Sequence, residues 1–296
     1  MKVYGKNGPR MLKEMLEKPE IIVAPGCYDA LSARLIEQTG FKAAFMTGFG
    51  SSGSVLGEPD YGLMTMTEMV NVCVNMNAVI SIPLIGDIDT GYGNPLNVYR
   101  TVREFERAGM AAVHLEDQVF PKRCGHMEGK AVIPMEEHIE KIRAAVDARE
   151  EMLIIARTDV RAVSGMDEVI RRLTAYRDAG ADIIYADALR SEEEMARLCA
   201  IEGCYKFTNQ VEFGKTPIMP VSKLQDIGFD IVIYPDSTIF TSAKAMKKML
   251  SKLKTDGITR EDPELMTTFE EFNGIVGMKE QQDREAKYRT AQFEGR

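Results

Sequence analysis

The segment Ala111-Ala-Val-His-Leu-Glu116 is almost entirely apolar on both of its alternating faces and ends in a carboxylate. This pattern is typical of a parallel strand covered by helices, because an antiparallel strand with one wet face alternates apolar and polar residues. Further short runs share this composition and predict strands at Ile21–Ala24, Ala43–Thr47, Ile82–Asp87, Met152–Arg157, Asp182–Asp187, Tyr205–Asn209 and Asp230–Tyr234.

Amphipathic stretches with helical spacing separate these runs. The predicted helices are Ala30–Gln38, Thr67–Asn77, Pro95–Ala108, Met135–Ala148, Met166–Ala179, Glu192–Ile201 and Thr241–Lys254. Repeated strand–helix alternation without a Gly/Ser-rich linker predicts an α/β fold, a (β/α)8 TIM barrel. A doubly wound sheet is the competing fold, but no GxGxxG turn follows the first strand. The glycine-rich run Gly48–Ser54 follows the second strand, where we expect an anion-binding loop or a connector.

The sequence predicts a single barrel domain over residues 1–296, with residues 241–296 as a C-terminal helical extension. This extension keeps its own apolar positions, namely Leu265, Met266, Phe269, Phe272, Ile275, Val276 and Met278. A closed barrel has no free face for so many, and exposed they would form a larger apolar patch than monomers usually carry. The extension therefore either folds back over its own barrel or packs against a second subunit.

Composition excludes several functional classes. The 296 residues carry 45 acidic and 37 basic side chains, a formal net charge of −8, which argues against nucleic acid as the partner. No apolar run approaches the roughly 20 residues of a membrane helix. The first residues lack the apolar core of a signal peptide. Five dispersed cysteines are typical of reduced thiols, so we expect a cytoplasmic protein without membrane contact.

Polar side chains gather where the predicted strands end, which is where barrel enzymes place their active sites. Asp87 and Asp89 enter a glycine-rich turn after the third strand, and His114 and Glu116 lie on the fourth. Carboxylates meeting at one rim favour a hard divalent cation. Mg²⁺ is the leading candidate because it needs one or two carboxylates and keeps several waters; Mn²⁺ is not distinguished from it. The competing interpretations are turn formation by the aspartates and a core position for His114.

The segment Asp117–Lys130, DQVFPKRCGHMEGK, has no apolar periodicity. It predicts a long loop after the fourth strand, of the kind that often covers an active site. Cys124 follows two cations and precedes Gly125 and His126. Neighbouring cations favour the thiolate, so Cys124 is a candidate proton donor or nucleophile. A solvated basic loop with an incidental cysteine is the competing interpretation.

Four motifs occur in a fixed order: Asp87-x-Asp89-x-Gly91-x-Gly93, Val113-His-Leu-Glu-Asp-Gln118, Lys122-Arg-Cys-Gly-His126 and Ala156-Arg-Thr-Asp159. Together they resemble the isocitrate lyase/phosphoenolpyruvate mutase superfamily, and the similarity runs from about Val23 to Lys244. The KRCGH segment is similar to the catalytic loop of the lyase branch of that superfamily.

The resemblance implies a metal-dependent C–C bond cleavage that releases pyruvate from a 2-hydroxy acid. It assigns catalytic roles to Cys124, Lys122, Arg157 and His126, with Cys124 protonating the departing carbanion. It implies metal binding by Asp87, Asp89, Glu116 and His114. It also implies substrate contacts from Phe45, Thr47, Gly48, Phe49, Gly125, Arg157, Asp187, Asn209 and Pro235.

Three departures from methylisocitrate lyases bear on the substrate. Phe45 replaces a tyrosine near the substrate hydroxyl, which leaves Lys122, Tyr92 or a metal-bound water as the proton acceptor. Asp187 replaces a glutamate, and the stretch Tyr234–Thr241 has no arginine for a third carboxylate. Because an unpaired buried charge is costly, a hydroxy-dicarboxylate of the 2-alkylmalate type is favoured.

The first expectation is therefore cleavage of 2,3-dimethylmalate to pyruvate and propionate, and the alternative is cleavage of 2-methylisocitrate to pyruvate and succinate. Phosphonomutases lack the loop cysteine, and oxaloacetate hydrolases carry a serine near the position of Pro235, so both are less favoured. The resemblance also implies a homotetramer, built from dimers that exchange their C-terminal helices.

Overall fold

The computed structural model describes residues 7–124, 129–259 and 261–288. The chain divides into two compact units, Met1–Ile239 and Phe240–Arg296. The first unit holds the sheet and the site residues, and the second holds most of the C-terminal helices.

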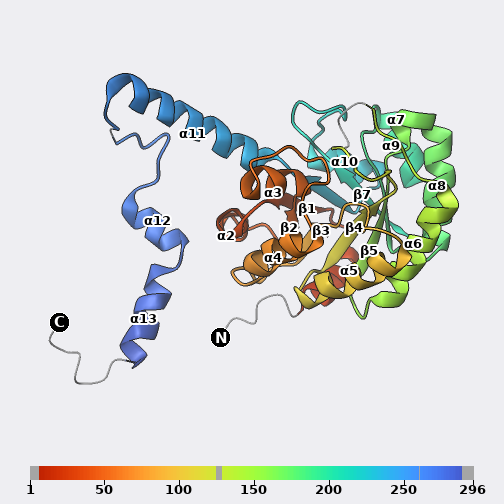
Figure 1. Cartoon of the computed structure of the whole chain (residues 1–296), viewed down its shortest axis with the longest axis horizontal. Helices are drawn as coiled ribbons and strands as arrows, with labels where there is room; N and C mark the ends of the chain where they lie inside the picture. Colours follow the sequence, from red (N-terminus) through yellow and green to blue (C-terminus); the bar gives the residue numbers. More distant parts are fainter. Residues whose placement is uncertain (1–6, 125–128, 260, 289–296) are drawn as a thin grey trace. The chain divides into compact units, whose positions relative to one another are not determined.

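The first unit is a closed barrel of eight parallel strands that follow one another in sequence order (Figure 1). The strands are β1 Ile22–Cys27, β2 Ala44–Met46, β3 Leu84–Asp87, β4 Ala112–Glu116, β5 Leu153–Thr158, β6 Ile183–Ala186, β7 Tyr205–Asn209 and β8 Ile231–Tyr234. In the register, Val113 of β4 lies between Gly86 of β3 and Ile154 of β5. The predicted TIM barrel and all of its predicted strands are confirmed, with small shifts at the strand ends.

Helices surround the strands in Figure 1. They are α1 Gly8–Leu16, α2 Ala30–Gln38, α3 Gly48–Val55, α4 Met66–Asn77, α5 Pro95–Arg107, α6 Met135–Ala148, α7 Arg161–Ser164, α8 Met166–Asp178, α9 Glu192–Cys199 and α10 Val221–Ile227. Helix α11 Ser237–Asp256 follows β8 and lies mostly in the second unit. Side-chain caps begin several of them. Asp29 accepts from the Ser32 amide 2.7 Å away at the start of α2, and Asn94 caps α5 in the same way.

For the glycine-rich run after β2 the sequence predicted an anion-binding loop or a connector. That prediction is wrong, because Gly48–Val55 forms helix α3. The Thr47 hydroxyl caps it by accepting from the Gly50 amide at 3.2 Å. Glycine at position 48 serves close approach, not flexibility, since a Cβ there would lie 2.5 Å from Asp87 Oδ2.

The barrel interior is filled by apolar side chains such as Phe45, Ile155 and Phe207, all buried. Leu12 and Leu16 of α1 belong to the same cluster. Helix α1 therefore packs against the barrel's own interior residues. Two further clusters fill the space between the strands and their covering helices.

The second unit continues α11 and adds α12 Phe269–Ile275 and α13 Met278–Tyr288. The helical extension that the sequence predicts is thus present. Large apolar side chains on it are exposed, with Phe269 at 85% and Leu250 at 56%. Among the described residues, no helix combines the length and apolarity needed to cross a bilayer.

Candidate active site

One cavity of the first unit gathers most of the residues predicted for the site. Predicted residues that line it are Phe45, Thr47, Phe49, Asp87, His114, Cys124, Arg157, Asp187, Asn209 and Pro235. Lining residues that the sequence reasoning did not select are Asp60, Tyr185, Val211, Ile233 and Asp236. Gly125 and His126 lie outside the described residues. Gly48, Asp89, Glu116 and Lys122 adjoin the lining residues, through the contacts below.

Asp87 ends β3 with a buried carboxylate. Its Oδ1 accepts from the Asp89 amide at 2.8 Å and lies 3.6 Å from Nδ1 of His114. Asp89 has a φ of 49°, an uncommon backbone for a non-glycine residue, so the turn holds both carboxylates in a fixed arrangement. Burial raises the pKa of Asp87, and it raises the pKa of Asp89 to about 7. Burial therefore disfavours the ionised form of both carboxyl groups unless a cation lies nearby.

His114 is a packed, neutral imidazole. Its ring stacks on Phe45 with centroids 5.5 Å apart and meets Tyr185 edge-on at 5.9 Å. Burial and the nearby Arg157 and Lys122 cations hold the pKa of His114 well below its usual range. The ring therefore supports Asp87 from behind and is poorly suited to taking up a proton.

Lys122 is fully engaged by carboxylates. Its Nζ lies 2.6 Å from Asp60 Oδ1 and 2.8 Å from Asp89 Oδ1, and its side chain is buried. Despite burial, the carboxylates of Asp60 and Asp89 hold the pKa of Lys122 well above its usual value. Lys122 is thus a permanent cation that organises the acidic side of the cavity, and it has no lone pair to accept a proton.

Arg157, from the end of β5, is oriented by Asp159. Its Nε and Nη2 donate to the two Asp159 oxygens at 2.9 and 3.1 Å. Its Nη1 faces Glu116 Oε2 at 3.2 Å, and Nη2 also lies 3.7 Å from Asp187 Oδ2. Asp159 therefore fixes the fork, and its remaining N–H groups are directed between two carboxylates.

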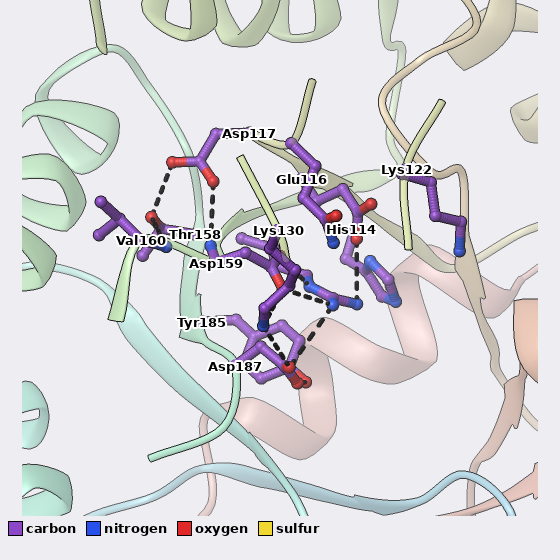
Figure 2. Close-up of polar contacts among 12 residues, drawn as sticks. His114, Glu116, Asp117, Lys122, Lys130, Thr158, Asp159, Val160, Tyr185 and Asp187 are labelled. Atoms are coloured by element: carbon purple, nitrogen blue, oxygen red, sulfur yellow. Dashed lines mark hydrogen bonds and ion pairs between the residues drawn. The ribbon is translucent and has the colours of Figure 1, made fainter. Parts of the chain in front are cut away.

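Lys130 completes this network, as Figure 2 shows. Its Nζ lies 3.0 Å from Asp159 Oδ1 and 3.7 Å from Asp187 Oδ2. Asp187 Oδ1 also accepts from the Tyr185 hydroxyl at 2.6 Å and from the Asn209 amide at 2.8 Å. The sequence reasoning took Lys130 only as the end of the loop. Its contacts arise from tertiary structure, and no local motif signals them.

Glu116 and Asp117 point to different surroundings (Figure 2). Neither Glu116 oxygen has a hydrogen-bond partner among the described residues, although both are buried. Asp117 accepts from Thr158 Oγ1 at 2.7 Å, Arg172 Nη1 at 2.9 Å and the Tyr176 hydroxyl at 2.9 Å. Asp117 is a satisfied structural carboxylate, whereas Glu116 faces the site with unmet hydrogen-bonding capacity.

Charge around the cavity is unbalanced. The carboxylates are Asp60, Asp87, Asp89, Glu116, Asp159, Asp187 and Asp236, and the cations are Lys122, Lys130 and Arg157. Buried anions in such excess require protons or a bound cation. No three described His, Cys, Asp or Glu side chains form a ready-made ligand set. A hydrated Mg²⁺ takes one or two carboxylates and retains waters, and the excess of buried carboxylates, with both Glu116 oxygens lacking a hydrogen-bond partner among the described residues, fits such an ion.

A barrel with this carboxylate rim, a loop cysteine and an oriented arginine is the architecture of a class of enzymes. The chain belongs to this class: the family model for phosphoenolpyruvate phosphomutase matches residues 12–254, which places the protein in the phosphoenolpyruvate mutase/isocitrate lyase superfamily.

Two curated relatives are similar over nearly the whole chain. The 2,3-dimethylmalate lyase of Eubacterium barkeri is 44% identical over 289 residues, which cover 96% of this chain and 99% of that protein. The 2-methylisocitrate lyase of Aeropyrum pernix is 42% identical over 277 residues, covering 94% of this chain and 90% of that protein.

Two solved structures share the fold. A crystal structure of 2,3-dimethylmalate lyase superposes with a TM-score of 0.91 at 37% identity, covering 99% of this chain and 98% of that one. The structure of oxaloacetate acetylhydrolase in complex with 3,3-difluorooxalacetate also gives a TM-score of 0.91, at 35% identity, covering 95% and 96%. These relatives are enzymes on closely related scaffolds with different substrates.

Proposed function

We propose that this enzyme is a Mg²⁺-dependent lyase that cleaves 2,3-dimethylmalate into pyruvate and propionate. The observation that carries the proposal is the lining of one cavity by Cys124, Asp87 and Arg157. These are a proton donor, a metal-binding carboxylate and a carboxylate-binding guanidinium. A C–C lyase acting on a 2-hydroxy acid needs these three functions together.

The N-terminus of α3 binds the carboxylate of the pyruvyl half. Thr47 caps Gly50, which leaves the amides of Gly48 and Phe49 directed out of the helix. The Arg157 fork, held by Asp159, binds a substrate carboxylate between Glu116 and Asp187.

Asp87 and Asp89 bind Mg²⁺, directly or through water, with Glu116 on the same rim and His114 packed behind Asp87. When bound, the cation lowers the pKa of the substrate hydroxyl and stabilises the oxyanion that forms. Lys122 keeps Asp60 and Asp89 in place through its two short ion pairs. Burial of these groups makes their carboxylates strong ligands for the ion.

Cys124 donates a proton to the carbon that leaves. Heterolysis of the C–C bond gives pyruvate and the carbanion of propionate, a dianion, and the thiol neutralises that carbon. Asn209, Gly125 and His126 bind the departing carboxylate. Exclusion of water around the dianion favours protonation by the thiol over protonation by solvent.

Charge selects a dicarboxylate over a tricarboxylate. Among the described lining residues Arg157 is the one cation, against Asp60, Asp87, Asp187 and Asp236. A third substrate carboxylate would add an unpaired buried anion to this wall. The second candidate, 2-methylisocitrate, is favoured by the 42% identity to the Aeropyrum enzyme.

A substrate panel tests the proposal. Purified enzyme with Mg²⁺ is assayed for pyruvate from 2,3-dimethylmalate and from 2-methylisocitrate, for oxalate from oxaloacetate, and for turnover of phosphonopyruvate. We expect the highest kcat/KM for 2,3-dimethylmalate. Dominant release of pyruvate from 2-methylisocitrate would select the second candidate, and dominant turnover of either remaining compound would overturn the lyase assignment.

We also propose that the protein is a homotetramer, built from dimers that exchange their C-terminal helices. We further propose that it functions in a reducing cytoplasm. The exposed apolar residues of α11 and α12 support a subunit contact. All five cysteines are free thiols. Truncation after Gly257 should give dissociated or insoluble protein in light scattering, because this truncation removes α12 and α13. A folded, active monomer would contradict the exchange.

A further inference from the structure

The proposed lyase reaction begins with removal of the substrate's hydroxyl proton, and two protein groups suggested by the sequence do not suit that step. Lys122 is a buried ammonium on Asp60 and Asp89 with its pKa held well above the usual value. Tyr92 is absent from the residues that line the cavity, and burial raises the pKa of its hydroxyl well above 10. Of the acceptors suggested by the sequence a metal-bound water remains, and a protein base would have to be another group.

Other titratable groups of the lining are already engaged. Asp60 holds Lys122, and Asp187 accepts from Tyr185 and Asn209 while facing two cations. His114 is stacked and has a lowered pKa. Asp87 belongs to the metal site. Asp236 differs from all of these, because it has no ion-pair partner among the described residues.

The path of the backbone after β8 places Asp236 close to the end of β2. Gly26 of β1 lacks a side chain where a Cβ would collide with the Pro235 backbone, so the end of β8 passes directly over β1. This passage brings Asp236 Oδ1 within 3.3 Å of Thr47 Oγ1, at the end of β2. Gly48, the next residue, lies against Asp87 Oδ2. Thr47 and Gly48 therefore connect Asp236 to the proposed metal-binding carboxylate of Asp87.

We propose that Asp236 is the general base that removes the proton from the hydroxyl group of the 2-hydroxy acid. This inference rests on the proposed lyase function and extends it. The hydroxyl proton passes to a carboxylate oxygen of Asp236, and the O–H electron pair forms the carbonyl of pyruvate. The electron pair of the broken C–C bond remains on the departing carbon, which takes the proton of Cys124. Product release leaves protonated Asp236 and a Cys124 thiolate, and water exchanges one proton between them.

The electrostatic surroundings suit this role. Burial raises the pKa of Asp236 to about 7, against the Thr47 hydrogen bond, with smaller contributions from the charges of Asp60, Glu212 and Asp187. Lys122 is bound to Asp60 and Asp89. A base whose pKa lies near neutral pH combines availability with proton affinity.

The test compares two carboxylate-to-amide variants of the full-length enzyme. Asp236→Asn keeps an acceptor for Thr47 but removes the base, so kcat should fall about 10²–10⁴-fold. The acid limb of kcat/KM against pH should disappear with it. Binding of oxalate with Mg²⁺, measured by calorimetry, should stay within a few-fold of wild type and report an intact site.

Glu212→Gln is the matched control. Glu212 accepts from the Ser237 hydroxyl and is absent from the cavity lining. Removing its charge should keep kcat near wild type and move the acid limb to lower pH, because one negative charge near Asp236 is gone. Should Asp236→Asn fail to fold, this shift carries the test, and an unmoved limb would overturn the assignment.

The outcomes separate the two proposals. Absence of pyruvate release from every 2-hydroxy acid by the wild-type enzyme overturns the lyase function and the base together. Pyruvate release by wild type with an unimpaired Asp236→Asn variant, or with its acid limb intact, overturns the base alone. Loss of oxalate binding in that variant along with kcat would mean that Asp236 shapes the pocket, which also overturns the assignment.

Discussion

Glu116 and Asp117 are neighbours in sequence, both fully buried, yet their surroundings are opposite. Asp117 accepts hydrogen bonds from Thr158, Arg172 and Tyr176, and from the Asp159 amide at 2.9 Å. Glu116 has Arg157 nearby at 3.2 Å but no hydrogen bond to either oxygen among the described residues. Burial raises the pKa of both, and that of Glu116 rises well above its usual value.

At the end of β4, therefore, one carboxylate is satisfied by the fold and its neighbour is not. A buried carboxylate with all its acceptor sites used stabilises the fold, because removing its anion would leave donors unpaired. A buried carboxylate with unused oxygens destabilises the fold until a ligand arrives. We therefore assign Asp117 to the framework between β4, β5 and α8. Glu116, Asp87 and Asp89 form the group of carboxylates that we propose binds a cation.

The largest effect on activity is expected for the carboxylates that we propose bind the metal. Asp87→Ala, or removal of divalent cations with excess EDTA, should lower kcat/KM by at least about 10³-fold, because the metal stabilises the oxyanion. Thermal unfolding provides a second readout. Mg²⁺ should raise the Tm of wild type by mass action and leave the Tm of Asp87→Ala unchanged. Full activity in EDTA would refute the metal role.

Cys124 provides the next largest effect. Cys124→Ser should lower kcat by about 10²–10⁴-fold with little change in KM, since a hydroxyl is a far weaker acid than a thiol. Steady-state kinetics of pyruvate release measures this. A serine variant with normal kcat would show that another group protonates the departing carbon.

The third prediction concerns stability, for which we expect the larger effect at Asp117 and the smaller one at Glu116. Asp117→Asn should destabilise the protein by about 3–5 kcal/mol, because it removes the anion that accepts from Arg172 Nη1, Tyr176 and Thr158 and leaves Glu168 as the other carboxylate on Arg172. Glu116→Gln should change the metal-free protein by less than about 1 kcal/mol or stabilise it, because Arg157 keeps its two hydrogen bonds to Asp159 and a buried acid with a raised pKa is removed. Urea unfolding without metal compares them. Equal losses of unfolding free energy in the two variants would show that Glu116 and Asp117 do not differ in their contribution to stability.

The sequence predicted the barrel well because its signals are local. Apolar runs such as Ala111–Glu116 and caps such as Asn94 act within a few residues, and the structure keeps them. The glycine run after β2 was misread, since glycines normally weaken helices. Here they accommodate Asp87, a contact between separate strands that no local pattern reveals.

The site was predicted in part for the same reason. Strand-end position and the KRCGH motif selected Asp87 and Cys124, which both line the cavity, because position and motif can be read directly from the sequence. Asp60, Lys130 and Asp236 carry no such signal. Each gains its role from a partner distant in sequence, as with Lys122 for Asp60 and Thr47 for Asp236.

The smallest effect is the pH dependence of stability without metal. Folding raises the pKa of Asp89 from 3.8 to about 7, and it raises the pKa of Glu116 in the same direction. The folded state therefore binds more protons than the unfolded state between about pH 4 and 7, so the free energy of unfolding falls as pH rises through this window. The fall should be of the order of a few kcal/mol, and urea unfolding from pH 5 to pH 8 measures it. Glu116→Gln should flatten the slope. Mg²⁺ takes the place of the protons and should restore stability most at the alkaline end. Burial also lowers the pKa of His114, which adds stability as pH rises, so the carboxyl contribution is read from the difference between wild type and Glu116→Gln. Equal slopes for the two proteins would show that Glu116 is not protonated by folding.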